Sequence, residues 1–145
     1  MMESGRWIPP TDCGYSPPLP TPHQGEKDYM SIKRIEAGSR MSQAVIHGDT
    51  VYLAGQVAHK SPGKPVGQQT EEILGSIDRL LAEAGTDKSK ILSAQIWLTD
   101  ISKWSEMNEV WDAWLSPGNA PARATVEAKL AGPDFNVEIM VVAAR

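Results

Sequence analysis

The stretch NVEIMVVAA, residues 136–144, decides the fold because it has the pattern of a buried strand near the end of the chain. Alternation with a period of two places Glu138 on the same strand face as Met140 and Val142. A carboxylate among apolar side chains needs a partner, or its pKa rises. The stretch therefore predicts a core strand that also carries a charged group with a special role.

The composition is that of one compact, acidic domain. The chain has 145 residues, 41% of them hydrophobic, and a formal net charge of -4. It has no basic cluster with interleaved aromatic residues, which argues against a surface for nucleic acids or anionic membranes. We therefore expect neither kind of partner.

The cellular location of the protein is predicted from the targeting and membrane segments that the sequence lacks. No apolar run approaches the roughly 20 residues that span a bilayer. The opening MMESGRW has no basic segment followed by an apolar one, so a secretory signal is not expected. Cys13 is the one cysteine, which excludes a disulfide within the chain. A cytoplasmic protein is the expectation.

Residues 1–29 differ in composition from residues 30–145. They are rich in proline and show neither helical nor strand periodicity. Such a segment buries too little apolar surface to offset the entropy lost on ordering. We expect an arm that is flexible or left over from cloning, followed by one patterned domain that opens at Met30.

The patterned domain alternates strands and helices in a readable order. Three strands, a helix, a strand, a helix and two strands are predicted at residues 31–37, 43–47, 50–57, 68–84, 91–99, 102–115, 122–130 and 136–144. This order predicts an α+β fold, with a mixed sheet and both helices on one face. The other face is too apolar to be fully solvated, which favours an oligomer.

Several features of these elements are more specific. Thr70 is a candidate N-cap of the first helix, and Gly85 is a candidate for its C-terminal end. A tryptophan stripe, Trp104, Trp111 and Trp114, follows helical spacing in the second helix and is typical of a core. Trp97 shares its strand face with Gln95 and is a candidate for an interface.

Common catalytic signatures are missing. The three histidines (His23, His47 and His59) have no paired spacing and no partner cysteines, so no metal site is predicted. The sequence contains no G-x-S-x-G, P-loop or G-x-G-x-x-G pattern. Cys13 lies in the arm and is a poor candidate nucleophile.

One arginine is hard to explain as a surface residue. In APARATVEA, residues 120–128, Arg123 alternates with short alanines and shares its face with Thr125. The short neighbours leave its planar fork accessible to a carboxylate in a cleft. We expect the strand of Glu138 to pair with this strand across the Gly132 turn. The alternative is an Arg123–Glu138 ion pair that binds no ligand.

Residues 30–145 resemble the RidA (YjgF) family of reactive intermediate deaminases, most closely its YoaB-like branch. The segments that carry the resemblance are SQAVIHGDTVYLAGQVA (42–58), MNEVWDAW (107–114), PARATVEA (121–128) and VEIMVVAA (137–144). The resemblance implies a chorismate-mutase-like fold and a homotrimer with clefts between subunits. The arm has no counterpart in the family.

The resemblance also implies an activity and a set of site residues. Members of this type hydrolyse enamines and imines such as 2-aminoacrylate to 2-keto acids and ammonia, without a cofactor. The family's binding arginine falls on Arg123 and its carboxylate on Glu138. Gly55 matches a position that offers backbone groups to the ligand, and Asn108 matches a polar residue of the second helix.

The chain departs from the family pattern beside these positions. Met41 stands where deaminating members have a tyrosine, and Thr125 stands where many have a cysteine. Met140 replaces a second glutamate. Arg40 adds a cation next to Met41, and a ligand with two acidic groups would suit it if Arg40 reached the cleft.

Three functions follow as hypotheses. In the first, Arg123 holds a substrate carboxylate and Glu138 activates a water for imine hydrolysis. In the second, the same cleft binds or senses a small carboxylate metabolite without turnover, which the loss of the tyrosine at Met41 favours. The third is a role in RNA cleavage or translation, as described for some members of the family, and the acidic balance argues against it.

Overall fold

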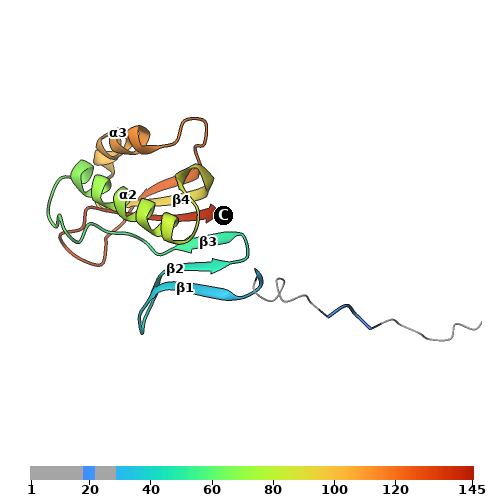
Figure 1. The fold of residues 1–145 in the computed structure, drawn as a ribbon. Helices are drawn as coiled ribbons and strands as arrows, with labels where there is room; N and C mark the ends of the chain where they lie inside the picture. Colours follow the sequence, from blue (N-terminus) through green and yellow to red (C-terminus); the bar gives the residue numbers. More distant parts are fainter. Residues whose placement is uncertain (1–17, 22–28) are drawn as a thin grey trace, which may run out of the picture.

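A computed structural model describes residues 18–21 and 29–145. The predicted arm therefore lies mostly outside the described residues, as do Cys13 and His23. The elements, drawn in Figure 1, are β1 (Ile32–Ala37), β2 (Ser42–His47), β3 (Thr50–Leu53), α2 (Val66–Glu83), β4 (Ile91–Leu98), α3 (Trp104–Trp114), β5 (Ala122–Glu127) and β6 (Val137–Ala144), with short 3-10 turns η1 (Lys88–Lys90) and η2 (Ile101–Lys103).

The strands form one mixed sheet in the order β1-β2-β3-β6-β4-β5. Only β5 runs parallel to its neighbour, β4, whereas the other pairs are antiparallel. Both α2 and α3 lie on one side of the sheet (Figure 1). The predicted α+β class with two helices on one face is confirmed.

The predicted pairing of the last two strands is wrong. β6 pairs with β3 on one side and with β4 on the other, so that β4 separates it from β5. The connection through residues 128–136 is long enough to cross over β4 instead of closing a tight hairpin. Parallel β5 therefore becomes an edge strand of the sheet.

The opening stretch is a buried strand, as predicted, and it lies between β3 and β4 in the sheet. The side chains of one face of β6 are almost completely buried, at 0% to 1% exposure, and they are Val137, Ile139, Val141 and Ala143. The apolar stripe of α2 packs in the same core through Ile73, Leu74, Ile77, Leu80 and Leu81. Burial of this kind contributes about 25 cal/mol per Å² of apolar surface, which is the main force that holds α2 on the sheet.

The start of α2 differs from the prediction and its end agrees with it. Thr70 is not the N-cap, because the helix begins at Val66 and the buried Thr70 hydroxyl donates to the Val66 carbonyl at 2.7 Å. Glu106 of α3 instead accepts from the Gly67 N–H at 3.1 Å. Gly85 adopts the left-handed φ of 83° expected just past a helix end.

The tryptophan stripe is only partly in the core. Trp111 is 2% exposed, but Trp104, at the first position of α3, is 48% exposed. On the sheet face opposite the helices, Tyr52 and Val126 are exposed, and Trp97 is half-buried. This open, apolar face agrees with the expectation that the face is not fully polar.

No helix in the described part of the chain is both long and apolar enough to cross a membrane.

Candidate functional site

Arg123 lies on the edge strand β5, on the face that carries the helices. Its register partner on β4 is Ala94, which belongs to the core. One terminal nitrogen, Nη1, donates to Asn108 Oδ1 of α3 at 2.8 Å. The guanidinium carbon lies 5.3 Å from the centroid of the Trp111 ring. The structure therefore brings together Arg123 and Asn108, as predicted, and adds Trp111.

The Arg123 guanidinium has no carboxylate partner. Among the residues that the structure describes, Arg79 is the one basic side chain that forms ion pairs, and its partners are Glu36 and Glu83. Arg123 is half-buried and keeps N–H donors beyond the single hydrogen bond to Asn108. Within one chain, the alternative of an Arg123–Glu138 ion pair is therefore wrong.

Thr125 adds a second unsatisfied group on the same face of β5. Its register partner is buried Ile96, two positions along β4 from the partner of Arg123. The hydroxyl oxygen of Thr125 is buried and has no hydrogen-bond partner in the described part of the protein. Buried hydroxyls are normally hydrogen-bonded. The unpaired Thr125 hydroxyl and the remaining N–H donors of Arg123 therefore suit a polar ligand atom on this face of β5.

Glu138 lies on the opposite face of the sheet, beside Gly55. A Cβ added to Gly55 would stand 2.0 Å from Glu138 Oε1, so only glycine leaves room for this carboxylate. Both residues line a hollow of about 440 Å³, hereafter the Glu138 hollow. Met41, 48% exposed, forms part of its wall. Arg40 is exposed and is not among the lining residues.

Three other charged side chains that line the Glu138 hollow (Glu36, Glu72 and Arg79) are already paired with protein atoms. Arg79 reaches Glu36 Oε1 at 2.6 Å, and Glu72 accepts from the Lys60 N–H at 2.8 Å and from the Ser61 hydroxyl at 2.5 Å. These hydrogen bonds lower the pKa of Glu72 against the opposing effect of desolvation, which is the largest single contribution.

Glu138 has no hydrogen bond or ion pair to any other described residue. Desolvation by burial raises the pKa of its carboxyl above the ordinary value of a glutamate. Desolvation is the one cause of this shift, and Arg123 makes no contribution to the pKa within one chain. The carboxylate is thus a stronger base than an exposed glutamate and keeps its lone pairs for a water or a ligand.

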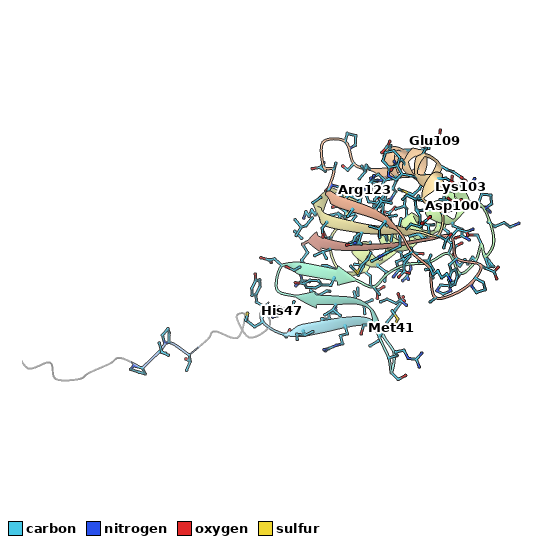
Figure 2. The ribbon with its side chains drawn as sticks, turned by 180° about the vertical axis from the view of Figure 1, so that it is seen from behind. Met41, His47, Asp100, Lys103, Glu109 and Arg123 are labelled. Carbon is cyan, nitrogen blue, oxygen red and sulfur yellow. The ribbon has the colours of Figure 1, made fainter. Side chains whose placement is uncertain are left out.

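Arg123 and Glu138 do not share a crevice within one chain, which corrects the prediction. Their partners on β4 are Ala94 and Trp97, an odd number of positions apart, so the two side chains point to opposite faces of the sheet. Figure 2 shows Arg123 on β5 and Met41 beside the β1–β2 turn, at opposite ends of the sheet. The predicted residues form two separate half-sites.

Metal ligation has no structural basis among the described residues. No group of three or more histidine, cysteine, aspartate or glutamate side chains lies close enough together to hold an ion. His59 packs edge-on against the Phe135 ring at 5.4 Å, and both line the Glu138 hollow.

Comparison with known proteins identifies close relatives. A family model described as Endoribonuclease L-PSP matches residues 31–145. A RutC family protein of Haemophilus influenzae is 46% identical over 114 residues, which cover 79% of this chain and 98% of the relative. The RutC family protein YoaB of Escherichia coli is 43% identical over 115 residues, covering 79% of this chain and 99% of the relative.

Solved structures agree in fold over the same region. A member of the YjgF protein family from Neisseria meningitidis superposes with a TM-score of 0.78 at 43% identity, covering 81% of this chain and 97% of that one. A Mycobacterium tuberculosis member of the YjgF/YER057c/UK114 family gives a TM-score of 0.71 at 29% identity, covering 79% and 100%.

Proposed function

The chain belongs to the RidA (YjgF) family, and on this premise we propose that it hydrolyses enamine or imine intermediates of the 2-aminoacrylate type to 2-keto acids and ammonia. The observation that carries the proposal is Arg123, a half-buried guanidinium with no carboxylate partner among the described residues. A cation in this state is a ready site for a small organic anion.

Arg123 would bind the substrate carboxylate. A guanidinium offers paired, charge-assisted hydrogen bonds in the geometry that a carboxylate needs. Asn108 fixes one edge of the guanidinium through Nη1, which leaves its other donors for the ligand. The bound carboxylate places the C=N carbon, so the contribution of Arg123 to catalysis is mainly orientation.

Glu138 would act as the general base. Its raised pKa and free lone pairs suit it to take a proton from a water that attacks the imine carbon. An enamine first becomes the imine by gaining a proton at its terminal carbon and losing one from nitrogen. Glu138 then returns the proton of the attacking water to the nitrogen of the tetrahedral carbinolamine, the carbinolamine hydroxyl gives its proton to the nitrogen as the C–N bond breaks, and ammonia leaves with the former C–N electron pair. The carbonyl of a 2-keto acid is the other product. An imine is already electrophilic, so the step as proposed needs no cofactor.

Two copies of the chain would complete each cleft. The half-sites of Arg123 and Glu138 face away from each other within one chain, and among the described residues Tyr52 and Val126 stay exposed on the apolar face of the sheet. In the proposed homotrimer, the Arg123 side of one subunit meets the Glu138 hollow of the next. This arrangement would complete each cleft and would cover the apolar face of the sheet.

The test generates 2-aminoacrylate or a longer imine in situ in the presence of semicarbazide. It measures how much less semicarbazone forms when the protein is present. The wild-type protein should compete with semicarbazide, and Arg123→Ala should raise KM at least about tenfold, as expected for a lost charge-assisted contact. Equal, uncatalysed rates with the wild type and with Arg123→Ala would rule the activity out, and equal rates above that background would rule out Arg123 as the residue that binds the carboxylate.

The pH dependence tests Glu138 separately. A base acts only when deprotonated, and desolvation raises the pKa of this carboxyl, so kcat/KM should rise with pH through a midpoint above the ordinary glutamate value of about 4.3. Glu138→Gln should lose most of the activity, and its remaining kcat/KM should no longer fall at low pH (the acid limb of the profile). An acid limb that survives in Glu138→Gln would exclude Glu138 as the base.

A second candidate is binding without turnover, favoured by Met41. The thioether at this wall of the hollow supplies no phenol to donate a hydrogen bond to an intermediate. In this case calorimetry would show binding of pyruvate, 2-ketobutyrate or a dicarboxylate, with no hydrolysis of any imine. Arg40, exposed and outside the hollow, would approach only a ligand that extends beyond it.

The matching family model carries the description of an endoribonuclease. A net charge of -4 does not favour a phosphate backbone, and we do not propose RNA cleavage for this chain.

A further inference from the structure

Trp111 touches the arginine on which the proposed function rests. Its indole is 2% exposed, and the Arg123 guanidinium carbon lies 5.3 Å from the centroid of its ring. This distance is within the range of about 6 Å over which a ring face attracts a cation. The helical spacing of Trp111 is that of a core residue, but one face of its ring serves the candidate site.

The indole of Trp111 is itself held in place. The Trp114 ring packs against it with centroids 5.4 Å apart and planes at 51°. Trp114 Nε1 in turn donates to Asp78 Oδ2 of α2 at 3.0 Å. The ring below Arg123 is therefore fixed by side chains of both helices.

Two contacts define the pose of Arg123. The indole of Trp111 lies against the guanidinium, and Asn108 binds Nη1 at one edge. All five N–H donors of a guanidinium point outward in its plane, and the Trp111 ring carries no oxygen acceptor that would compete for them. The remaining donors are the ones that a carboxylate would engage.

We propose that Trp111 is a positioning residue that holds the Arg123 guanidinium, by cation–π attraction, in the orientation that receives the substrate carboxylate. The inference rests on the proposed function. An acidic partner would hold Arg123 equally well but would compete with the substrate for its donors and its charge. An aromatic face stabilises the cation without occupying those donors, which suits a site that is emptied after each turnover.

The experiment replaces Trp111 with tryptophan analogues that carry one, two or three ring fluorines. Fluorination weakens the attraction of the ring for a cation with little change in its shape. We expect log KM for the imine, and log Kd for 2-ketobutyrate, to rise linearly with fluorine number, by about threefold to thirtyfold in total. The value of kcat should change by less than about twofold, because a weaker hold on the cation lowers the affinity of Arg123 for the carboxylate, whereas every bound substrate still meets an intact guanidinium.

The same analogues at Trp104 are the matched control. Trp104 lies on the same helix and is 48% exposed, and the described ring that Arg123 contacts is that of Trp111, so KM and Kd should not change with fluorine number at Trp104. Trp111→Tyr should retain more affinity than Trp111→Leu, because only the phenol ring keeps a π face. A flat series at Trp111 in an active protein would overturn the positioning role alone. A wild type that neither hydrolyses imines nor binds 2-keto acids would overturn the proposed function, and this inference with it.

Discussion

At the residue scale, the close approach of Gly55 to Glu138 is the sharpest constraint. In Gly55→Ala the new Cβ would stand 2.0 Å from Oε1 and 2.9 Å from the Glu138 carboxyl carbon, so the carboxylate must move. The backbone of Gly55 is outside the positive-φ region, so alanine adds no backbone strain there. We expect kcat/KM to fall at least about tenfold with the fold retained, as measured by the semicarbazide assay and circular dichroism.

Gly75→Ala is the control for this substitution. Gly75 lies inside α2, and a Cβ there meets nothing within 4 Å. Alanine should leave the rate unchanged and stabilise the protein by about 0.5–1 kcal/mol, the usual gain over glycine in a helix interior. Full activity in Gly55→Ala would show that the position of the Glu138 carboxylate is not critical.

At the element scale, α3 supplies the cap that α2 lacks. The N-cap position, Pro65, makes no side-chain hydrogen bond, and Glu106 Oε1 accepts from the Gly67 N–H instead. Glu106→Ala should therefore lower the free energy of unfolding by about 0.5–2 kcal/mol, the usual cost of a lost cap. Urea denaturation measures this free energy of unfolding. The control is Glu109→Ala on the exposed side of α3, whose free energy of unfolding should lie within about 0.5 kcal/mol of the wild-type value. Equal losses in both variants would contradict the capping role.

At the scale of the whole molecule, the opposed half-sites predict complementation between inactive subunits. Arg123→Ala and Glu138→Gln each remove one half of every cleft. If clefts form between subunits, unfolding and refolding the two variants together in equal amounts should restore about a quarter of the clefts, since assembly is random. The measurement is imine hydrolysis together with mass determination of the assembly. Arg123→Ala mixed with Asn108→Ala should recover nothing, because both changes affect the same half. A mixed trimer without recovered activity would show that Arg123 and Glu138 do not serve the same cleft.

The sequence predicted what depends on local periodicity. The alternation in residues 136–144 predicted a buried strand, and the apolar stripe from Ile73 to Leu81 predicted α2. Burial imposes the period of two in a strand and of three to four in a helix directly. The order of strands was harder to predict. Residues 128–136 read as a turn at Gly132, but nothing local records that β4 inserts between β5 and β6. The error placed Arg123 and Glu138 on one face.

Roles that depend on contacts between distant elements were also missed. A tryptophan at helical spacing has the same pattern whether its ring packs on aliphatic side chains or on a guanidinium, so Trp111 was assigned to the core alone. Its position three residues after Asn108, on one helix face, was the available signal. Likewise, Thr70 was a plausible cap because the cap from Glu106 is invisible in the local sequence.

Both ends of the described domain meet at the β2–β3 turn. The Tyr29 hydroxyl donates to Asp49 Oδ2 at 2.8 Å, and the backbone N–H of Arg145 donates to the Asp49 carbonyl at 2.9 Å. Met41 and its wall of the hollow lie at the other end of β2 (Figure 2). A fluorophore, surface tether or fused reporter joined at Arg145 would therefore start from the corner opposite the hollow. A protein immobilised through Arg145 is therefore a practical form in which to test whether 2-keto acids bind at the hollow.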